Sequence, residues 1–282
     1  MARGWASSPL GFVRRVGVAA YEDNIPFLAS AMAFEALLAA IPFVVLMMAV
    51  LGYFVHAGDD AVKDVLNLTG LLVPSAGEMA SDPYREAEWL LKLIADSRGQ
   101  LSIYGIPLFL WFSTRFFGAT RAALNDVFDT PESRSWIVGK QIDFVLVIAS
   151  LVLIVLNAML TLSVVDKPWL GRFFTSVSTF GLSMIVFFIV YMTAPTRRMR
   201  WDTAMVASAV ASLGFEISKR LYTIYLTKFA TLDRLVSNTN LIAILLLVAW
   251  MYYTSFVFLV GAEVGETYDM RRRQQEQRAI LT

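Results

Sequence analysis

Six apolar stretches, each about as long as a bilayer is thick, constrain this chain more than any other feature. A helix needs roughly 20 mostly apolar residues to cross a hydrocarbon core of about 30 Å. Only 17% of the residues are charged, against about 25% in soluble domains. We therefore predict an all-α, polytopic membrane protein with a bundle of six transmembrane helices. They are expected at Ala29–Val55, Leu101–Ala119, Ile142–Val164, Phe173–Ala194, Thr203–Leu226 and Leu241–Val264.

Positive charge near the ends of these stretches predicts the orientation of the chain. Cytoplasmic loops of membrane proteins carry an excess of lysine and arginine, and a cytoplasmic N-terminus gives thirteen inside against four outside. The inner set is Arg3, Arg14, Arg15, Arg121, Arg134, Lys140, Arg197, Arg198, Arg200, Arg271, Arg272, Arg273 and Arg278. The outer set is Lys167, Arg172, Lys228 and Arg234. Six crossings then place both termini in the cytoplasm.

One membrane domain with two flanking segments is the simplest organisation. Residues 1–25 form a partly amphipathic cytoplasmic lead-in, residues 26–268 the six-helix domain, and residues 269–282 a basic cytoplasmic tail. Within the domain, residues 56–100 are net acidic and predict a small extracytoplasmic helical cap, in which a helix can start at Pro83. The apolar face of that helix lies either on the membrane or on the ends of its own bundle.

Ionisable residues inside the predicted spans are the best functional signal. Each costs roughly 2.5–3.5 kcal/mol to insert, so such groups face the bundle interior, pair, or line a water-filled path. At 1.5 Å per residue, Glu35 lies about 13 Å from the inner start of the first span, and Arg115 about 9 Å from the inner face. The two depths agree within several ångströms, so we expect Glu35 and Arg115 to be able to meet.

Three more charges fall on one face of the fifth span. Glu216, Lys219 and Arg220 are three and four residues apart and form a net-positive patch in the outer part of the membrane. The two cationic side chains either line a cavity or extend to the outer headgroups. Glu263, near the inner end of the sixth span, is either part of this intramembrane charge or an interfacial anchor.

Prolines and small residues shape the predicted helices. Pro42 and Pro107 each free a backbone carbonyl and are expected to bend the first and second spans. Small residues four apart, such as Ala207/Ala211 and Gly261/Gly265, let helices approach closely, which in most membrane proteins is packing rather than function. In the tail, three arginines either contact anionic lipid headgroups or only anchor the topology: Arg271, Arg272 and Arg273.

The chemistry of an enzyme is missing from the sequence. There is no cysteine and one histidine, His56, and no HExxH, Walker or G-x-S-x-G motif occurs. A metal-dependent nuclease would need several carboxylate or imidazole ligands that converge in water. We therefore expect no catalytic residues, no metal and no cofactor, and the near-neutral net charge of +1 predicts no nucleic-acid partner.

The ordered motifs resemble those of the YihY/BrkB family of bacterial inner-membrane proteins. The resemblance covers about Ala29 to Glu266 and rests on several short segments that follow the family's order and spacing. They are Ala31-Met-Ala-Phe34 with Leu37-Leu38 and Pro42, Arg121-Ala-Ala-Leu-Asn125, Tyr191, Pro195, Arg200-Trp201, Tyr225-Leu226, Phe229-Ala230, Trp250-Met-Tyr252 and Gly261-Ala-Glu263. The chain departs from the family at Glu35, Ala39 and Ser237–Asn240, so a family-wide mechanism cannot rest on Glu35.

The resemblance implies an inner-membrane setting rather than a reaction. The family has proposed links to serum resistance, to transport and to movement of envelope lipids or lipopolysaccharide precursors, and its older ribonuclease label was a mistaken assignment. We expect a transporter or flippase for an anionic lipid or other amphiphile. The alternatives are an ion- or proton-coupled exchanger that uses Glu35 or Glu216, and a non-transporting scaffold. The expected partners are membrane lipids, an anionic lipid substrate, and a second copy of the chain or an envelope protein.

Overall fold

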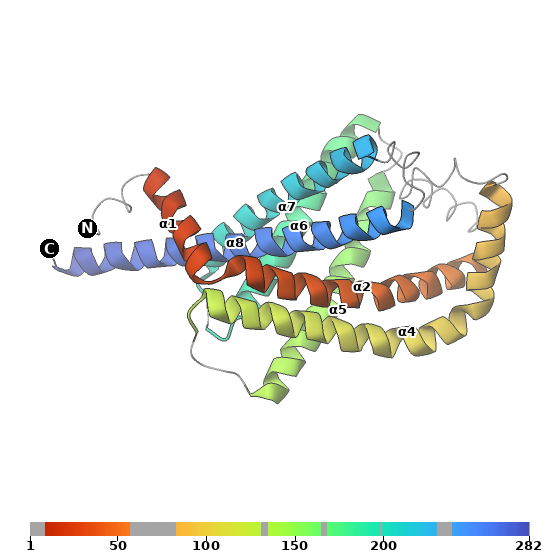
Figure 1. Cartoon of the computed structure of the whole chain (residues 1–282), viewed down its shortest axis with the longest axis horizontal. Coiled ribbons are helices and arrows are strands. Elements are labelled where there is room, and N and C mark those ends of the chain that lie inside the picture. Colours follow the sequence, from red (N-terminus) through yellow and green to blue (C-terminus); the bar gives the residue numbers. More distant parts are fainter. Residues whose placement is uncertain are drawn as a thin grey trace. The chain divides into compact units, whose positions relative to one another are not determined.

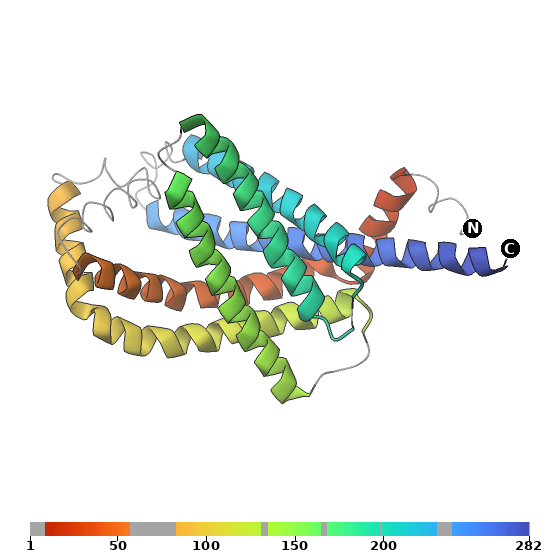
Figure 2. The same ribbon diagram turned by 180° about the vertical axis from the view of Figure 1, so that it is seen from behind.

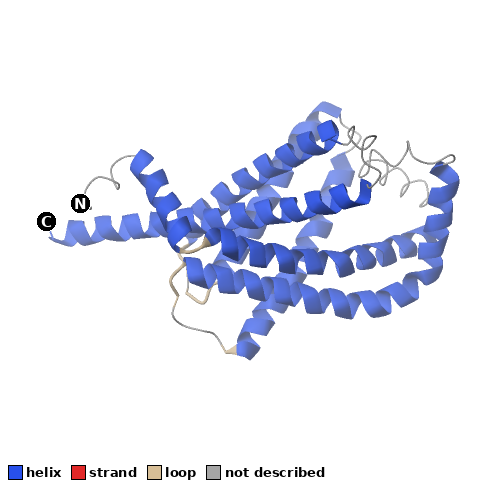
Figure 3. Ribbon diagram, in the orientation of Figure 1, coloured by secondary structure: helices blue, strands red, loops and turns tan. Residues whose placement is uncertain are grey.

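The computed structural model describes residues 9–56, 83–130, 135–164, 168–197, 199–229 and 239–281. These ranges are helical apart from short turns and loops, and they contain no strand (Figure 3). Figure 1 labels the helices in chain order. They are α1 (Pro9–Glu22), α2 (Ile25–His56), α4 (Pro83–Val127), α5 (Trp136–Val164), α6 (Pro168–Thr193), α7 (Trp201–Phe229) and α8 (Thr239–Leu281). The prediction of an all-α fold is confirmed.

Three described helical stretches are long and apolar enough to cross a membrane. They are Ile25–Val50, Trp136–Leu153 and Leu245–Gln277, and they overlap the first, third and sixth predicted spans. A shorter apolar stretch, Phe180–Thr193, lies in the fourth predicted span. The chain is therefore a helical membrane protein, and the count of six crossings stays a prediction.

The chain divides into two compact units. The first consists of residues 1–37 and 114–282, and the second of residues 38–113. In the first unit α7 packs against α8 and α6, α5 packs against α6, and α1 packs against α8. Figure 2 shows α5 and α6 from behind.

Small side chains bring α7 and α8 into close contact in the first unit. A Cβ atom on Gly261 would lie 2.7 Å from the Cβ of Ala211 and 2.9 Å from the backbone oxygen of Ala207. Gly265 is nearly as crowded, with Ala207 Cβ at 3.0 Å. The close approach expected from small residues four apart is therefore present, and it fixes the position of this part of α8.

An aromatic contact joins α6 to the same place on α8. The hydroxyl group of Tyr191 donates a 2.6 Å hydrogen bond to the backbone oxygen of Phe258, and the two rings stack with their centroids 4.8 Å apart. Tyr191 is fully buried. Because a buried phenol needs a hydrogen-bond partner, this contact helps to fix how α6 lies on α8.

The second unit holds both predicted helix bends. Pro42 and Pro107 lie inside the continuous helices α2 and α4, where each leaves one backbone carbonyl without its helical donor. A Cβ on Gly105 would lie 3.3 Å from Val45, so the glycine allows the two helices to approach there. The rings of Phe43 and Phe109 meet nearby at 5.8 Å.

Two helix ends of the first unit are closed by residues in the left-handed backbone region. Asn24 (φ 52°) follows α1 and precedes α2, and Asp129 (φ 44°) follows α4. Asparagine and aspartate tolerate this conformation better than other residues with a side chain. After α6, the backbone N–H of Thr196 donates to the side-chain oxygen of Asn125 at 2.8 Å, which ties the α6–α7 loop to the end of α4.

Two predicted segment boundaries fall inside continuous helices. Helix α4 begins at Pro83, as the sequence indicates, and runs without a break through Leu101 into the second predicted span. Helix α8 continues to Leu281, so residues 269–281 of the predicted basic tail extend the last helix. The position of residues 83–100 relative to a membrane stays a prediction. Residues 57–82 of the predicted cap lie outside the described residues.

Candidate functional site

Glu35 on α2 and Arg115 on α4 form a two-point ion pair. Arg115 donates from Nε to Glu35 Oε2 at 3.1 Å and from Nη2 to Oε1 at 2.5 Å. The Glu35 side chain is 15% exposed and that of Arg115 is 48% exposed. Paired charges cost less in a membrane than isolated ones. The meeting expected from their depths is present, and a role in transport stays a prediction.

The three charges on α7 are divided between a pair and a single arginine. Lys219 Nζ lies 2.6 Å from Glu216 Oε1 and 5.2 Å from the centre of the Phe215 ring. Arg220 is exposed and has no ion-pair partner within the described ranges. Because Glu216 neutralises Lys219, the net positive charge of this patch resides on Arg220.

An apolar groove of about 480 Å³ lies between α7 and α8. It is lined by Ser218, Leu221, Tyr222, Leu246, Ala249, Trp250 and Tyr253. Trp250 Nε1 is buried and has no hydrogen-bond partner among the described residues, while the Ser218 hydroxyl donates to the backbone oxygen of Gly214. The groove falls in the size range of small-molecule sites, and such sites combine apolar walls with a few polar groups.

A buried aspartate anchors α5 to α4. Asp143 is fully buried, and its Oδ1 accepts a 2.8 Å hydrogen bond from Arg121 Nη1. Lys140 lies 4.0 Å from Oδ2, which has no hydrogen-bond partner among the described residues. Gly139 leaves the space that the Arg121 guanidinium occupies, since a Cβ there would lie 2.7 Å from Nη1. The Arg121-to-Asn125 motif thus holds α5 through its first residue and the α6–α7 loop through its last.

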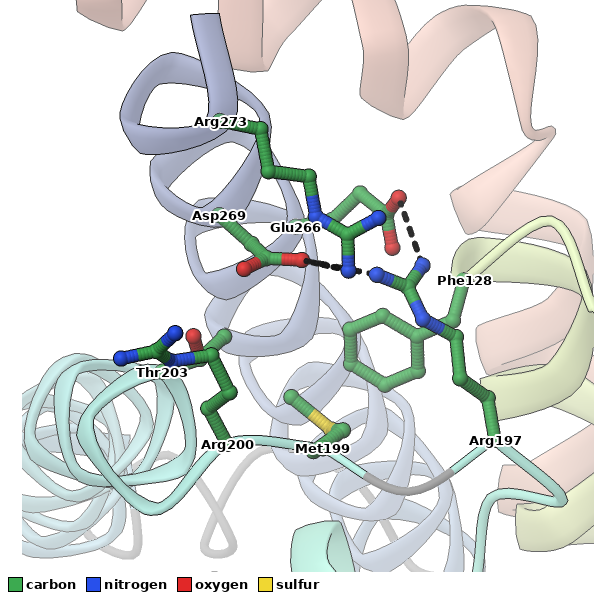
Figure 4. A pocket seen from close by; sticks show the side chains of 8 residues that line it. All are labelled: Phe128, Arg197, Met199, Arg200, Thr203, Glu266, Asp269 and Arg273. Atoms are coloured by element: carbon green, nitrogen blue, oxygen red, sulfur yellow. Dashed lines mark hydrogen bonds and ion pairs between the residues drawn. The ribbon is translucent and has the colours of Figure 1, made fainter. Parts of the chain in front are cut away.

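A second group of charges surrounds the C-terminal half of α8 (Figure 4). Arg197, from the α6–α7 loop, donates to Asp269 at 2.7 Å and lies 3.8 Å from Glu266. Arg273 reaches the same Asp269 oxygen at 3.0 Å. The cavity between these side chains and Phe128 measures about 20 Å³, which is room for a water molecule rather than for a larger anion.

The tail arginines differ in how they are engaged. Arg272 contacts Asp202 at the start of α7 and also Glu276, one turn further along α8. Arg273 binds Asp269, as described above. Arg271 has no partner within the described part of the chain. A role in lipid headgroup contact stays a prediction for all three, and Arg271 is the one that binds no carboxylate.

Glu263 is the most deeply buried acid of α8. Its side chain is 1% exposed, and it shares a hydrogen bond with Asp23 in the turn between α1 and α2. Its Oε2 has no partner among the described residues. In the described ranges, no group of three or more histidine, cysteine, aspartate or glutamate residues is arranged to hold a metal ion.

The sequence predicted no site role for several of these residues. Asp23, Asp269 and Arg197 lie outside the predicted spans, where charge is common and carries little signal. Asp143 is the second residue of its predicted span, a position that indicates the membrane interface. Burial distinguishes Asp143 and Asp269 from ordinary surface charges, and burial depends on the tertiary fold.

The long apolar helices define the class of this protein, a helical integral membrane protein. The chain belongs to the family described as virulence factor BrkB, whose family model matches residues 18–280. No solved structure matches the chain.

Relatives with similar sequences come from several bacteria. The chain is 25% identical to a UPF0761 membrane protein of Alteromonas mediterranea, over 92% of this chain and 89% of the relative. It is 24% identical to a UPF0761 membrane protein of Cronobacter sakazakii, over 95% and 92%. It is 22% identical to YfkH of Bacillus subtilis, whose name describes it as ribonuclease-like, over 86% and 89%.

Proposed function

We propose that this protein binds an anionic amphiphile, such as a lipid, in the α7–α8 groove and moves it across the membrane. The observation that carries the proposal is Arg220, a cation without a counter-ion among the described residues, on the same helix as the groove residues Ser218, Leu221 and Tyr222. A guanidinium group binds phosphate and carboxylate well. The apolar groove suits an acyl chain.

The cost of charge in a membrane supports this proposal. An arginine in a spanning segment costs several kcal/mol unless it meets water, a counter-ion or a headgroup. Glu35 and Glu216 neutralise Arg115 and Lys219, but no described carboxylate neutralises Arg220. A bound anionic headgroup would supply that missing charge.

A flippase assay in proteoliposomes tests the proposal. Fluorescent anionic and zwitterionic lipids are incorporated, and the protein is expected to move the anionic lipid faster than protein-free vesicles do. Arg220→Gln should remove most of this difference. Arg14→Gln changes an exposed arginine on α1, far along the chain from the groove, and should leave transport unchanged. Equal transport by the parent protein and Arg220→Gln would contradict the proposal.

The groove itself is tested by filling it. Ala249→Trp places a large ring among the groove residues and should reduce transport, while Leu213→Trp adds the same ring at an exposed α7 position that does not line the groove. Both proteins are compared at matched levels of reconstituted protein. Loss of transport in both variants would indicate a general disturbance of the membrane helices and would count against the groove.

A non-transporting scaffold is the second candidate. Two ion pairs favour the scaffold, because a sealed bundle needs its charges neutralised. They are Glu35 with Arg115 and Glu216 with Lys219. If the protein is a scaffold, the parent protein will move no lipid in vesicles of any composition. Its envelope partners would then copurify with it through residues outside the groove.

We also propose that the protein lies in the bacterial inner membrane with both termini in the cytoplasm. The support is the excess of lysine and arginine in the predicted inner loops and the similarity to bacterial membrane proteins. The chain has no cysteine, so single cysteines can be placed at Val13 and at Gln275 without a background. In intact spheroplasts, both should resist a membrane-impermeant thiol reagent and react only after permeabilisation.

A further inference from the structure

Two acids from opposite parts of the chain lie in hydrogen-bond contact in the first unit. The carboxyl groups of Asp23, in the α1–α2 turn, and Glu263, on α8, share a hydrogen bond. Two ionised carboxylates at hydrogen-bond distance repel each other, and a proton shared between them would remove that repulsion.

The surroundings of the pair supply little positive charge. Three arginines face six carboxyl groups there. The arginines are Arg15 on α1, Arg197 in the α6–α7 loop and Arg273 on α8. The carboxyl groups are Asp23, Glu22, Asp129, Glu263, Glu266 and Asp269.

These arginines are already engaged by other acids. Arg15 binds Glu22 at 3.2 Å, while Arg197 and Arg273 share Asp269. The Oε2 atoms of Glu263 and Glu266 are both buried and have no partner in the described ranges. Binding of a proton would reduce the excess negative charge of this group of acids.

Water can reach one side of the pair. Asp23 lines an open hollow of about 590 Å³, together with Asn24, Phe27, Leu28, Asn125, Asp126, Asp129 and Thr130. Glu263, in contrast, is 1% exposed and lies on the part of α8 that Gly261 and Gly265 hold tightly against α7. A proton can therefore enter from the hollow through Asp23, while Glu263 provides a fixed acceptor.

We propose that Asp23 and Glu263 form a proton-binding site, and that the bound proton holds the α1–α2 turn on α8. When the proton leaves, two anions face each other in a poorly solvated place and the turn separates from α8, because α8 is fixed by its packing. Burial raises the pKa of Asp23 above its ordinary value of 3.8, and the nearby carboxylate of Asp129 acts in the same direction. This inference does not depend on lipid transport.

Distance measurements between spin labels test the proposal on the full-length protein in nanodiscs. Labels are attached to Val13→Cys on α1 and Gln275→Cys on α8, both of which are exposed positions. Between about pH 5 and about pH 9, the parent distance distribution should shift to longer distances as the proton is lost. A distribution that stays constant over this range would overturn the proposal.

Amide variants separate the pair from its neighbours. Glu263→Gln keeps a hydrogen-bond donor without an ionisable proton and should stay docked at every pH, and Asp23→Asn should do the same. Asp126→Asn changes another acid of the same hollow and should keep the full pH-dependent shift. The proposal fails if Asp126→Asn abolishes the shift or if Glu263→Gln retains it.

Infrared difference spectra give a second readout that does not depend on docking. Lowering the pH should produce a protonated-carboxyl C=O band that disappears in Glu263→Gln and in Asp23→Asn but persists in Asp126→Asn. Exchange of sodium for potassium or choline at constant pH should change neither the band nor the distances. A response to the cation instead of pH would assign the site to a metal cation and overturn the proton proposal.

Discussion

The Arg121–Asp143 contact gives the sharpest prediction of stability. Asp143 is fully buried and Arg121 is its only hydrogen-bonding partner among the described residues. Removing one partner of a buried ion pair costs about 3–5 kcal/mol, because the remaining charge stays buried and unpaired. Lys140 lies 4.0 Å from the other carboxylate oxygen and offsets part of that cost. We therefore expect Arg121→Met to lower the free energy of unfolding by about 3 kcal/mol.

A double-mutant cycle identifies the cause of that loss. Asp143→Leu in the Arg121→Met background removes the stranded carboxylate and should recover most of the stability, to within about 1 kcal/mol of the parent. The assay is reversible unfolding of the purified protein from mild detergent into a denaturing detergent, followed by circular dichroism. If Arg121→Met costs less than about 1 kcal/mol, or if the double variant is no more stable than the single one, the contact does not anchor α5.

Three further predictions concern the packing and the charges of the first unit. Gly261→Ala should lower the free energy of unfolding by about 1–3 kcal/mol, because its Cβ would meet Ala211 Cβ and backbone on α7; Gly17→Ala, which meets no atom within 4 Å, is the control. Tyr191→Phe should cost about 1 kcal/mol in the same assay through loss of the hydrogen bond to Phe258, and an unchanged value would show that the ring stacking suffices. The pKa of Asp23 is raised in the folded state, so its carboxyl group stabilises the fold at low pH, and this stabilisation is lost as the pH rises through that pKa. Asp23→Asn should therefore flatten the pH dependence of the free energy of unfolding. An unaltered pH dependence would contradict a raised pKa at Asp23.

Local regularities made some contacts predictable from sequence. The position of a residue along a straight helix fixes its depth, so Glu35 and Arg115 could be matched from their distance to the helix starts. The spacing of small residues predicted that helices can approach closely at Ala207/Ala211 and at Gly261/Gly265, without predicting which helices meet. Both inferences need only the helical repeat and the thickness of a bilayer.

Contacts that depend on which helices become neighbours were beyond the sequence. The partner of Asp143 lies on another helix, and the hydrogen bond between Asp23 and Glu263 joins residues near opposite ends of the chain. Spacing on α7 also left two acceptable partners for Glu216, and only the side-chain geometry selects Lys219 over Arg220. That selection leaves Arg220 as the cation of α7 without an ion-pair partner among the described residues.

A structure determined in nanodiscs that contain anionic lipid tests the proposed binding mode most directly. We expect acyl-chain density in the α7–α8 groove, between Tyr222 and Trp250, with its headgroup in contact with the Arg220 guanidinium. The same density should be absent in Ala249→Trp, which fills the groove. An empty groove in the parent protein, with the Arg220 side chain extended to the headgroups of the bulk bilayer, would contradict lipid binding in the groove.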